Sequence, residues 1–548
     1  MRKMFSKLIL ASVLTMAFVG CASKNEAVKV SFEKTTDEET GREMIGNMFV
    51  TGLPVVKEPH TFSVLMSRSV NDYSASHDEK HILPILTENT NVIFDIEDVT
   101  TNMNEKLNLL FAAGSGLPDI IWAQPSDSTL VNNTTFLFEF TEEILREYAP
   151  NLTSQIEENI PEGLDALKKA DGKIYSLPTG VYAEYANSAT AVPLIRTDWL
   201  EKVGMEMPTT TDELYEVLKA FKTQDPNGNG KDDEIPLAFC QANWASKQFA
   251  FAGPWGIAGR NINDAEHYCL VQDGVVVPTL DTQAFKDYLL FLNKLAKEEL
   301  LDVEGFSLTN AQYQARLDEN VVGMQSTWAE DAEIWAPVPI LEAPGYEGKG
   351  VKQGQNGLRT ANMNGFVLTT SCEDPLAALR AWDYLHSTPE LKRISRDGNA
   401  GQLWIDNGDG TATVSSPETL PDGMTSDVDL NYTIAFRGLG ALMFGDDTAK
   451  PDMNAAEIND DVLRYQYVDF YKDYFLDEFL PIRPVSSDKL TEKTFLQTEL
   501  EAYINGFIAQ SVLNGLTEEQ WEEHLKQLEA VQYDAWIAWN QDYLDGKF

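Results

Sequence analysis

Short apolar runs alternate with helix-compatible or polar stretches along the chain after residue 60. The β-rich runs Thr61–Leu65 and Val92–Ile96 are separated by a polar stretch, and the run Asp119–Trp122 follows a short helix predicted over Lys106–Ala113. Strand-like runs that alternate with helix-like segments are typical of a parallel sheet covered by helices. The pattern therefore predicts an α/β protein.

Three later stretches predict amphipathic helices. Thr210 and Glu213 form a capping box ahead of apolar residues at the spacing i, i+3, i+4 and i+7. The apolar positions between Phe285 and Leu295 trace a second helix. Near the C-terminus, Thr517 and Gln520 have the spacing of another helix cap, so a terminal helix is expected there.

The first residues resemble a lipoprotein signal peptide. Basic residues precede a mostly apolar run, Leu8–Val19, and Gly20 stands directly before Cys21. Such a run is too short to span a bilayer and is typical of a cleaved secretory signal. We expect residues 1–20 to be removed, Cys21 to carry the lipid chains, palmitate among them, and residues 21–58 to form a flexible tether. An ordinary signal peptide with an incidental cysteine is the alternative.

Composition restricts the classes of function. The formal net charge of −44 and the isoelectric point near 4.4 argue against a nucleic-acid partner, because binding phosphates requires clustered Lys and Arg. With 43% hydrophobic residues over 548 positions, the chain can fill two hydrophobic cores. After Cys21 no stretch approaches the ~18 apolar residues of a transmembrane helix.

The three remaining cysteines, Cys240, Cys269 and Cys372, have no zinc-ligand spacing and predict no disulfide framework. Cys240 could pair with Cys269, or all three could be buried free thiols.

The run Asp225-Pro-Asn-Gly-Asn-Gly-Lys-Asp-Asp-Glu234 has the spacing of a calcium loop. Oxygen ligands fall at alternate positions, and Gly230 occupies the sharp bend at position six. Position twelve is Pro236 rather than the bidentate Glu of an EF-hand, so Glu234 would close the site from position ten. The expected ligands, with Lys231 using its backbone carbonyl, are Asp225, Asn227, Asn229, Lys231, Asp233 and Glu234. A metal-free turn rich in Asn, Gly and Asp is the alternative.

This shortened loop between a helix and a strand resembles that of extracellular solute-binding protein family 1, the sugar-binding lipoproteins of bacterial ABC importers, especially the long, calcium-loop type that binds oligosaccharides or alginate. Further segments resemble the same family in the same order along the chain: Gly116–Ile121, Ala149–Leu152, Ala170–Pro178, Ile195–Met205, Glu319–Met324 and Asn364–Thr369. The resemblance covers nearly the whole chain after residue 60.

The resemblance implies a periplasmic-binding-protein fold, in which two α/β lobes are joined by a hinge and a ligand cleft lies between them. It places residues 59–186 and 360–405 in the first lobe. Residues 187–359 and 406–548, with the calcium loop at 225–234, would form the second lobe.

Ligands of α/β sheets bind beyond the carboxyl ends of strands. A sugar ring stacks its C–H face on an aromatic ring, while its hydroxyl groups require polar side chains. The aromatic and polar residues near predicted strand ends and lobe crossovers are therefore the candidate ligand contacts: Trp122, Gln124, Ser126, Tyr182, Glu184 and Tyr185 on the first side, and Trp244, Trp255, Trp328, Trp335 and Trp404 on the second side or near a crossover. Because Trp is highly buried on average, core packing is the alternative for each tryptophan.

The family resemblance predicts a monomeric substrate-binding subunit, lipid-anchored outside the cell membrane, that closes on a carbohydrate and delivers it to the permease subunits of an ABC importer, with calcium as a structural cofactor. No Gly-x-Ser-x-Gly or His-Glu-x-x-His motif is present, so no enzyme activity is expected. The alternatives are a surface glycoside hydrolase and a calcium-dependent adhesion or cell-wall-binding lipoprotein.

Overall fold

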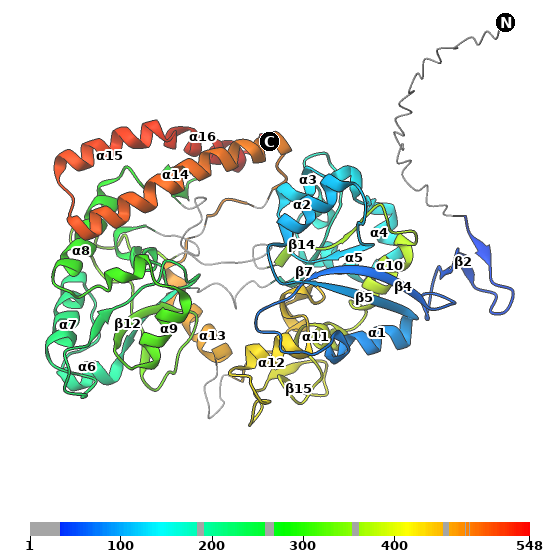
Figure 1. Ribbon diagram of the computed structural model, residues 1–548, viewed down its shortest axis with the longest axis horizontal. Helices are drawn as coiled ribbons and strands as arrows, with labels where there is room; N and C mark the ends of the chain where they lie inside the picture. Colours follow the sequence, from blue (N-terminus) through cyan, green and yellow to red (C-terminus); the bar gives the residue numbers. More distant parts are fainter. Residues whose placement is uncertain are drawn as a thin grey trace, which may run out of the picture.

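The computed structural model describes residues 33–182, 191–257, 268–352, 361–452, 460–476, 478–481 and 483–548. Within this part of the chain, two α/β lobes lie side by side, each built around its own sheet (Figure 1). The described chain leaves the first lobe after Tyr182, returns to it at Ala361 and leaves it again after Asp452. The predicted α/β class is confirmed.

The first lobe contains a six-stranded sheet in the order β17-β7-β14-β6-β4-β5. Strand β4 pairs in parallel with β5 and β6, whereas β14 runs antiparallel to β6 and β7. The strands are β4 (His60–Ser67), β5 (Val92–Val99), β6 (Ile120–Trp122), β7 (Leu177–Tyr182), β14 (Ala361–Leu368) and β17 (Met443–Phe444).

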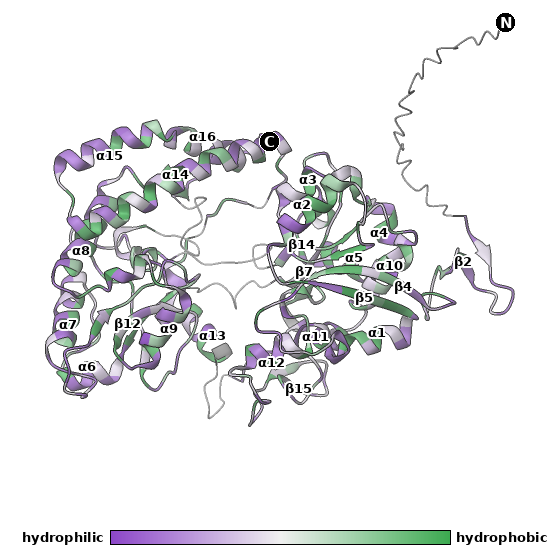
Figure 2. Ribbon diagram, in the orientation of Figure 1, coloured by the Kyte–Doolittle hydropathy of each residue, from purple (hydrophilic) through white to green (hydrophobic). Residues whose placement is uncertain are grey.

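Helices cover both faces of this sheet. Successive strand residues point to opposite sides, so each face carries apolar side chains that the helices bury. Leu65 and Ile121 pack in one cluster with α2, whereas Val64, Met66 and Trp122 pack in the larger cluster on the other face. Figure 2 shows the apolar residues concentrated along the strands. The helices are α1 (Ile82–Thr90), α2 (Met103–Ala113), α3 (Asp127–Val131), α4 (Glu142–Tyr148), α5 (Pro150–Asn159), α10 (Pro375–Tyr384), α11 (Pro389–Asp397) and α12 (Asp427–Ile434).

The second lobe contains a four-stranded sheet in the order β13-β8-β12-β9, in which β12 and β9 are parallel. Its strands are β8 (Val192–Arg196), β9 (Ile235–Leu237), β12 (Val322–Thr327) and β13 (Trp335–Pro337), with a separate hairpin of β10 (Cys269–Gln272) and β11 (Val275–Pro278). Its helices are α6 (Thr197–Val203), α7 (Thr211–Thr223), α8 (Gln283–Lys297), α9 (Asn310–Asp318), α13 (Asp460–Tyr471), α14 (Ser487–Asn514), α15 (Glu518–Ala530) and α16 (Tyr533–Leu544).

The predicted helix caps of the second lobe are confirmed. The hydroxyl of Thr210 accepts a hydrogen bond from the Glu213 backbone N–H at 3.1 Å, and the Glu213 carboxylate accepts one from the Thr210 backbone N–H at 3.3 Å. Thr517 and Gln520 cap α15 in the same way. The apolar positions from Phe285 to Leu295 form the buried face of α8. Local sequence and global packing therefore agree in these helices.

Residues 43–56 belong to the folded first lobe, contrary to the flexible tether expected over 21–58. They include β2 (Glu43–Ile45) and β3 (Met48–Phe49), which form a small sheet with β1 (Thr35–Thr36). Ile45 and Met48 are buried in the first-lobe core, and Arg380 donates hydrogen bonds to the backbone carbonyls of Phe49 and Gly52. We call residues 33–58 the N-terminal arm. The buried apolar residues within 43–56 explain why this arm folds onto the first lobe.

Residues 406–452 also lie in the first lobe, although the sequence analysis assigned them to the second. Strand β17 pairs in parallel with β7, and Ala441, Leu442 and Phe444 are buried in the first-lobe core. The hairpin of β15 (Trp404–Asp406) and β16 (Ala412–Val414) precedes α12 on the same lobe. Because β17 has only two residues, it leaves no recognisable strand pattern in the sequence.

Cys240, Cys269 and Cys372 are all buried free thiols, so Cys240 and Cys269 do not pair. Among the described residues, no helix is both long enough and apolar enough to span a bilayer.

Candidate functional site

The carboxyl ends of β4, β5 and β6 open into a cavity of about 210 Å³ in the first lobe. Arg68 directly follows β4, Asp98 is near the end of β5, and Gln124 follows β6. Parallel strands place these three side chains at one edge of the sheet. Other residues lining the cavity come from the loop after β4 and from the α12 region: Ser69, Asp72, His77, Lys80, Tyr432 and Phe436.

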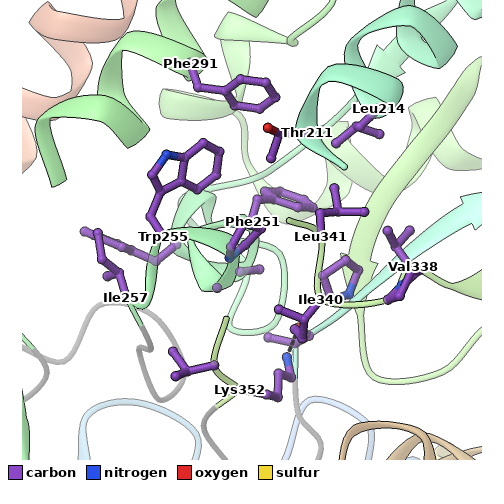
Figure 3. Close-up of a pocket in the computed structure, with 18 of the residues that line it drawn as sticks. Thr211, Leu214, Phe251, Trp255, Ile257, Phe291, Val338, Ile340, Leu341 and Lys352 are labelled. Carbon is purple, nitrogen blue, oxygen red and sulfur yellow. Dashed lines mark hydrogen bonds between the residues drawn. The ribbon is translucent and has the colours of Figure 1, made fainter. Parts of the chain in front are cut away.

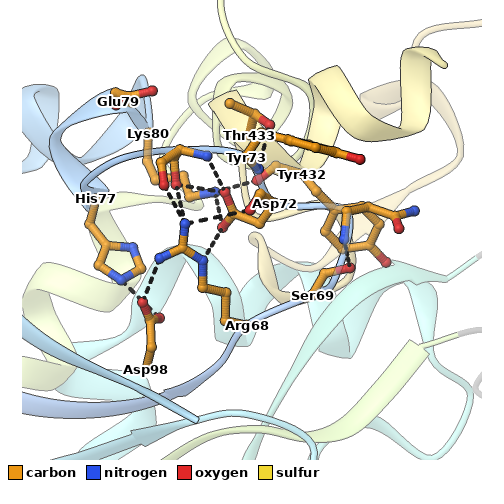
Figure 4. Close-up of polar contacts among 12 residues, drawn as sticks. Arg68, Ser69, Asp72, Tyr73, His77, Glu79, Lys80, Asp98, Tyr432 and Thr433 are labelled. Atoms are coloured by element: carbon orange, nitrogen blue, oxygen red, sulfur yellow. Dashed lines mark hydrogen bonds and ion pairs between the residues drawn. The ribbon is translucent and has the colours of Figure 1, made fainter. Parts of the chain in front are cut away.

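Charged side chains of this cavity form one hydrogen-bonded network (Figure 4). The Arg68 guanidinium donates to Asp98 at 2.9 Å, and His77 Nε2 lies 2.9 Å from the other oxygen of that carboxylate. The Lys80 ammonium, buried with its side chain 2% exposed, donates to Asp72 at 2.7 Å.

Burial opposes ionisation of Asp72, but hydrogen bonds from Lys80 and Ser74 outweigh this effect and lower its pKa. Burial lowers the pKa of Lys80, and the contact with Asp72 opposes the change. The pair is therefore held together by mutual compensation of two buried charges.

The second lobe presents two tryptophans at the corresponding edge of its own sheet. Trp328 directly follows β12, and Trp244 lies in the loop after the parallel strand β9. Their ring centroids are 5.5 Å apart with an edge-to-face geometry, and Trp244 is half exposed. The guanidinium of Arg464, on α13, lies 4.0 Å from the ring centroid of Trp328. Trp244 therefore presents an exposed aromatic ring near the carboxyl ends of β9 and β12.

A larger cavity of about 500 Å³ takes its walls from both lobes. Arg464 and Tyr465 of α13 line it from the second lobe. The first lobe contributes, among others, Tyr182, Arg396, Asp397, Asn431, Arg437 and Lys450. Since Arg464 also contacts Trp328, the cavity adjoins the tryptophan pair.

Several predicted ligand residues are core residues instead. Trp122 is fully buried: it packs against Trp382 and Phe436, and its indole N–H donates to the Leu439 carbonyl at 2.6 Å. Trp404 is buried as well, with its indole N–H donating to Gly398 at 2.7 Å.

Other predicted contacts are used locally. Trp335 is packed in the core of the second lobe, where the guanidinium of Arg196 lies over its ring. The hydroxyl of Ser126 caps α3 by accepting from the Thr129 backbone N–H. Glu184 and Tyr185 lie outside the described residues, as does Cys21.

Trp255 lines a separate apolar cavity inside the second lobe (Figure 3). Its ring packs against Tyr288 and Phe291, and the cavity has a volume of only about 50 Å³. At its edge the buried ammonium of Lys352 donates to the Ala191 carbonyl at 2.7 Å, and burial lowers the pKa of Lys352 to about 7. The space is too small for a sugar ring, so Trp255 has a packing role.

The predicted calcium loop is folded around its oxygen atoms. The two carboxylate oxygens of Asp225 accept backbone N–H bonds from Asn229 at 3.1 Å and Gly230 at 3.0 Å. The Asp233 carboxylate accepts from the side-chain amides of Asn227 at 3.2 Å and Asn229 at 3.0 Å. Gly230 has a φ of 74°, which favours glycine at the bend.

Glu234 carries the clearest sign that the loop suits a cation. The side chain is buried, and its Oε1 atom has no hydrogen-bond partner among the described residues. Burial raises its pKa, and the charges of Asp225 and Asp233 raise it further. A buried, unpartnered carboxylate oxygen beside two carboxylates fits a hard divalent cation.

The described residues contain no cluster of three or more His, Cys, Asp or Glu side chains suited to a metal ion. A cation in this loop would therefore depend on amide and backbone oxygens in addition to the carboxylates.

Sequence reasoning missed Arg68, Asp98 and Arg464. Arg68 and Asp98 stand at the ends of the first two strand-like runs, so the strand-end rule would have found them if it had been applied to charged residues. Arg464 is brought to the site by the third passage between the lobes, which has no local sequence signal.

No protein-family model matches the chain. The chain is 29% identical over 489 residues to the fructooligosaccharide ABC transporter substrate-binding protein FusA of Streptococcus pneumoniae serotype 4, covering 85% of this chain and 87% of FusA. It is 28% identical over 270 residues to lipoprotein LipO of Bacillus subtilis, covering 48% of this chain and 51% of LipO.

Two solved structures of S. pneumoniae FusA are also similar to the chain, one in complex with kestose and one of an EF-hand mutant in complex with fructo-nystose. Each has a TM-score of 0.75 and 25% identity, and covers 89% of this chain and 99% of the solved chain.

Two α/β lobes, three passages between them and a cavity with walls from both lobes define a receptor of the periplasmic-binding-protein type. In sequence and fold the chain is similar to the substrate-binding proteins that serve bacterial ABC importers, as the sequence predicts. Its relatives include a substrate-binding protein of an ABC transporter and a lipoprotein, which supports a binding role rather than an enzymatic one.

Proposed function

We propose that the chain captures an oligosaccharide between its lobes and presents it to the permease subunits of an ABC importer. The observation that carries the proposal is the cavity of about 500 Å³ with walls from both lobes. A ligand that contacts both walls stabilises the closed arrangement of the lobes relative to the open one. The permease would then recognise the closed form as the loaded protein. The binding of fructooligosaccharide by FusA supports a carbohydrate as the ligand.

In this proposal, Trp244 and Trp328 supply the apolar contacts to the sugar. Sugar rings would stack on Trp244 and Trp328, because an indole face excludes water from the ring's C–H groups. Hydroxyl groups of the same sugar would exchange hydrogen bonds with polar side chains of the opposite lobe, where Gln124 is exposed at the mouth of the first-lobe cavity.

The experiment is calorimetric titration of the purified mature protein with tri- to pentasaccharides. We expect at least one to bind and Trp328→Ala and Trp244→Ala each to weaken that binding by roughly tenfold or more, equivalent to about 1.4 kcal/mol. Phe495→Ala is the matched control, because this exposed aromatic lies on α14 away from the cavity. Unchanged affinity in both tryptophan variants, or no binding by any sugar, would refute the proposal.

Recovery of the bound sugar separates the receptor from a surface glycoside hydrolase. A receptor returns its ligand intact, so chromatography after denaturation should give only the starting oligosaccharide. Release of shorter products would contradict the proposed function.

We further propose that calcium stabilises the second lobe through the loop 225–234. Carboxylates of Asp225, Asp233 and Glu234, side-chain oxygens of Asn227 and Asn229, and the Lys231 carbonyl would hold the ion. The ion would supply charge compensation for the buried Glu234 and no chemistry at the sugar. The existence of a FusA EF-hand mutant supports a metal loop in this kind of protein.

The protein would be monomeric and anchored by lipid on Cys21 at the outer face of the cell membrane, as the signal-peptide pattern indicates. Cys21→Ser should release the protein from the membrane fraction of expressing cells; retention there would contradict lipid anchoring.

A further inference from the structure

The two lobes also touch outside the interlobe cavity. Ser487, the first residue of α14, donates a hydrogen bond from its hydroxyl to the side-chain oxygen of Asn132, which follows α3. Helices α14 and α3 are in direct contact at this point. Figure 1 shows α14 and α16 reaching from the second lobe toward α3 of the first lobe. We call this interface, which α14 makes with residues 127–132, the α14–α3 contact.

Opposite charges support the α14–α3 contact. Asp127 of α3 accepts hydrogen bonds from the Lys169 ammonium at 2.8 Å and from the Asn364 amide at 3.0 Å, both within the first lobe. Partial desolvation opposes ionisation of Asp127, but the charge and hydrogen bond of Lys169 and the bond from Asn364 outweigh it and lower the pKa. The charge of Lys493, on α14, lowers this pKa further. A cation of the second lobe therefore attracts an anion of the first.

The contact is loosely packed, so it can open. A cavity of about 370 Å³ lies beside it, and its walls include Lys169 from the first lobe and Arg483 and Tyr543 from the second. Asn132 and Asp127 are exposed to solvent. Exposed polar contacts contribute little to stability, and a small change in the angle between the lobes is enough to break them.

The pivot of the lobes lies between this contact and the interlobe cavity. The described chain leaves the first lobe at the end of β7 and returns at the start of β14, and these strands are neighbours. On the second lobe the same two passages end and begin at Ala191 and Lys352, which are joined by a hydrogen bond of 2.7 Å. Figure 1 shows β7 and β14 between α3, above them, and α12, below them. The interlobe cavity lies on the α12 side, where α13 supplies its second-lobe wall.

Two bodies that rotate about a pivot cannot close on both sides of it. Rotation that brings α13 toward α12 around a sugar moves α14 away from α3. We infer that the α14–α3 contact stabilises the open, sugar-free arrangement of the lobes and thereby sets the affinity for the sugar, an inference that rests on the proposed function. The apparent affinity falls in proportion to the population of the closed form, so weakening this contact strengthens sugar binding.

Two substitutions with opposite effects test the inference by calorimetry, with kestose, the sugar in a solved FusA complex, among the tri- to pentasaccharide probes. Ser487→Ala removes the hydroxyl donor, so the affinity for the sugar that binds should rise roughly two- to fivefold. Asn132→Asp places a carboxylate at the N-terminal end of α14, where the helix dipole and Lys493 favour negative charge, so the affinity should fall by a similar factor. A gain of affinity is informative because damage to the fold would lower it.

Ser154→Ala and Asn310→Asp are the matched controls. The Ser154 hydroxyl is exposed on α5 and bonds to the Asn151 carbonyl, whereas Asn310 is exposed in the first turn of α9. Both variants should bind the sugar as the wild type does. Unchanged affinity in Ser487→Ala and Asn132→Asp, or a change in the same direction in both, would overturn the inference, whereas the sugar binding itself would leave the proposed function intact.

Distances between spin labels test the rotation directly. Leu109 on α2 and Phe495 on α14 are exposed on the side of the α14–α3 contact, and Ile405 on β15 and Phe470 on α13 are exposed on the side of the interlobe cavity. Each pair is changed to cysteine in turn and labelled, because the native cysteines of the described chain are buried. With sugar, the Ile405–Phe470 distance should fall and the Leu109–Phe495 distance should rise. A fall in both distances, or no change between Leu109 and Phe495, would overturn the inference.

The same labels separate this inference from the proposed function. Absence of binding by every sugar would contradict the proposed function, and the sugar-free protein would then decide the role of the contact. Without sugar, Ser487→Ala should add a population with a shorter Ile405–Phe470 distance, and Asn132→Asp should not. Identical distance distributions in the wild type and Ser487→Ala would overturn the inference, even if a sugar binds.

Discussion

At the residue scale, a tryptophan's place relative to the end of its strand decides whether it can meet a ligand. Trp122 is the last residue of β6, and strand alternation points it toward α10, where it packs against Trp382. Trp328 comes one residue after β12, where the chain has left the sheet. The sequence predicts a strand that ends at Trp122, whereas the chain before Trp328 is recognised only by the resemblance of Glu319–Met324. One residue of uncertainty in a strand end changes the face on which a side chain lies.

The calcium loop yields a pH-dependent prediction at the same scale. Without metal, the raised pKa of Glu234 means that the folded protein favours the protonated carboxyl group. The contribution of Glu234 to the free energy of unfolding is therefore present at acidic pH and is lost as pH rises through the raised pKa. Calcium favours the ionised carboxylate. We therefore expect calcium to raise the melting temperature relative to EDTA, and the difference to grow from pH 4.5 toward pH 7.

Differential scanning fluorimetry across this pH range measures the effect. At a calcium concentration about 100 times the dissociation constant, binding adds about 2.7 kcal/mol, which corresponds to several degrees. Glu234→Gln should remove most of the calcium effect, whereas Glu216→Gln, on the exposed face of α7, should retain it. An EDTA-insensitive melting curve at neutral pH would refute calcium binding.

At the element scale, long segments with a clear period were predictable and short ones were not. The strands β4 and β5 and the helices α7 and α8 each carry a complete pattern of apolar positions or a cap. The N-terminal arm and β17 consist of strands of two or three residues, which acquire their stability only by packing on the first lobe. Tertiary contacts, rather than local sequence, determine these elements.

The N-terminal arm gives a stability prediction. Phe49 is buried, and the Arg42 guanidinium lies 3.6 Å from its ring centroid. Phe49→Ala should lower the free energy of unfolding of the first lobe by about 3 kcal/mol, as is typical when a buried aromatic is removed. Chemical denaturation measures this change, with the 92%-exposed Val70→Ala as the control. Wild-type stability in Phe49→Ala would mean that the arm is not part of the core.

At the scale of the whole molecule, the chain passes between the lobes after Tyr182, before Ala361 and after Asp452. The family resemblance predicted the two-lobe architecture, but the return to the first lobe over residues 406–452 depends on long-range pairing of β17 with β7. The N-terminal end of α14 also contacts the first lobe, where Ser487 donates to Asn132. Contacts of this kind would respond to movement of the lobes.

The central claim is that the two lobes close around a sugar that is returned unchanged. Small-angle X-ray scattering of the purified protein, with and without a saturating oligosaccharide that binds by calorimetry, tests this claim most directly. The account predicts a smaller radius of gyration in the sugar-bound state, and a smaller or absent change for the Trp328→Ala variant at the same sugar concentration. Identical scattering curves for the free and fully bound wild-type protein would show that the lobes form a rigid body, as an adhesion or cell-wall-binding protein would, and would contradict the account.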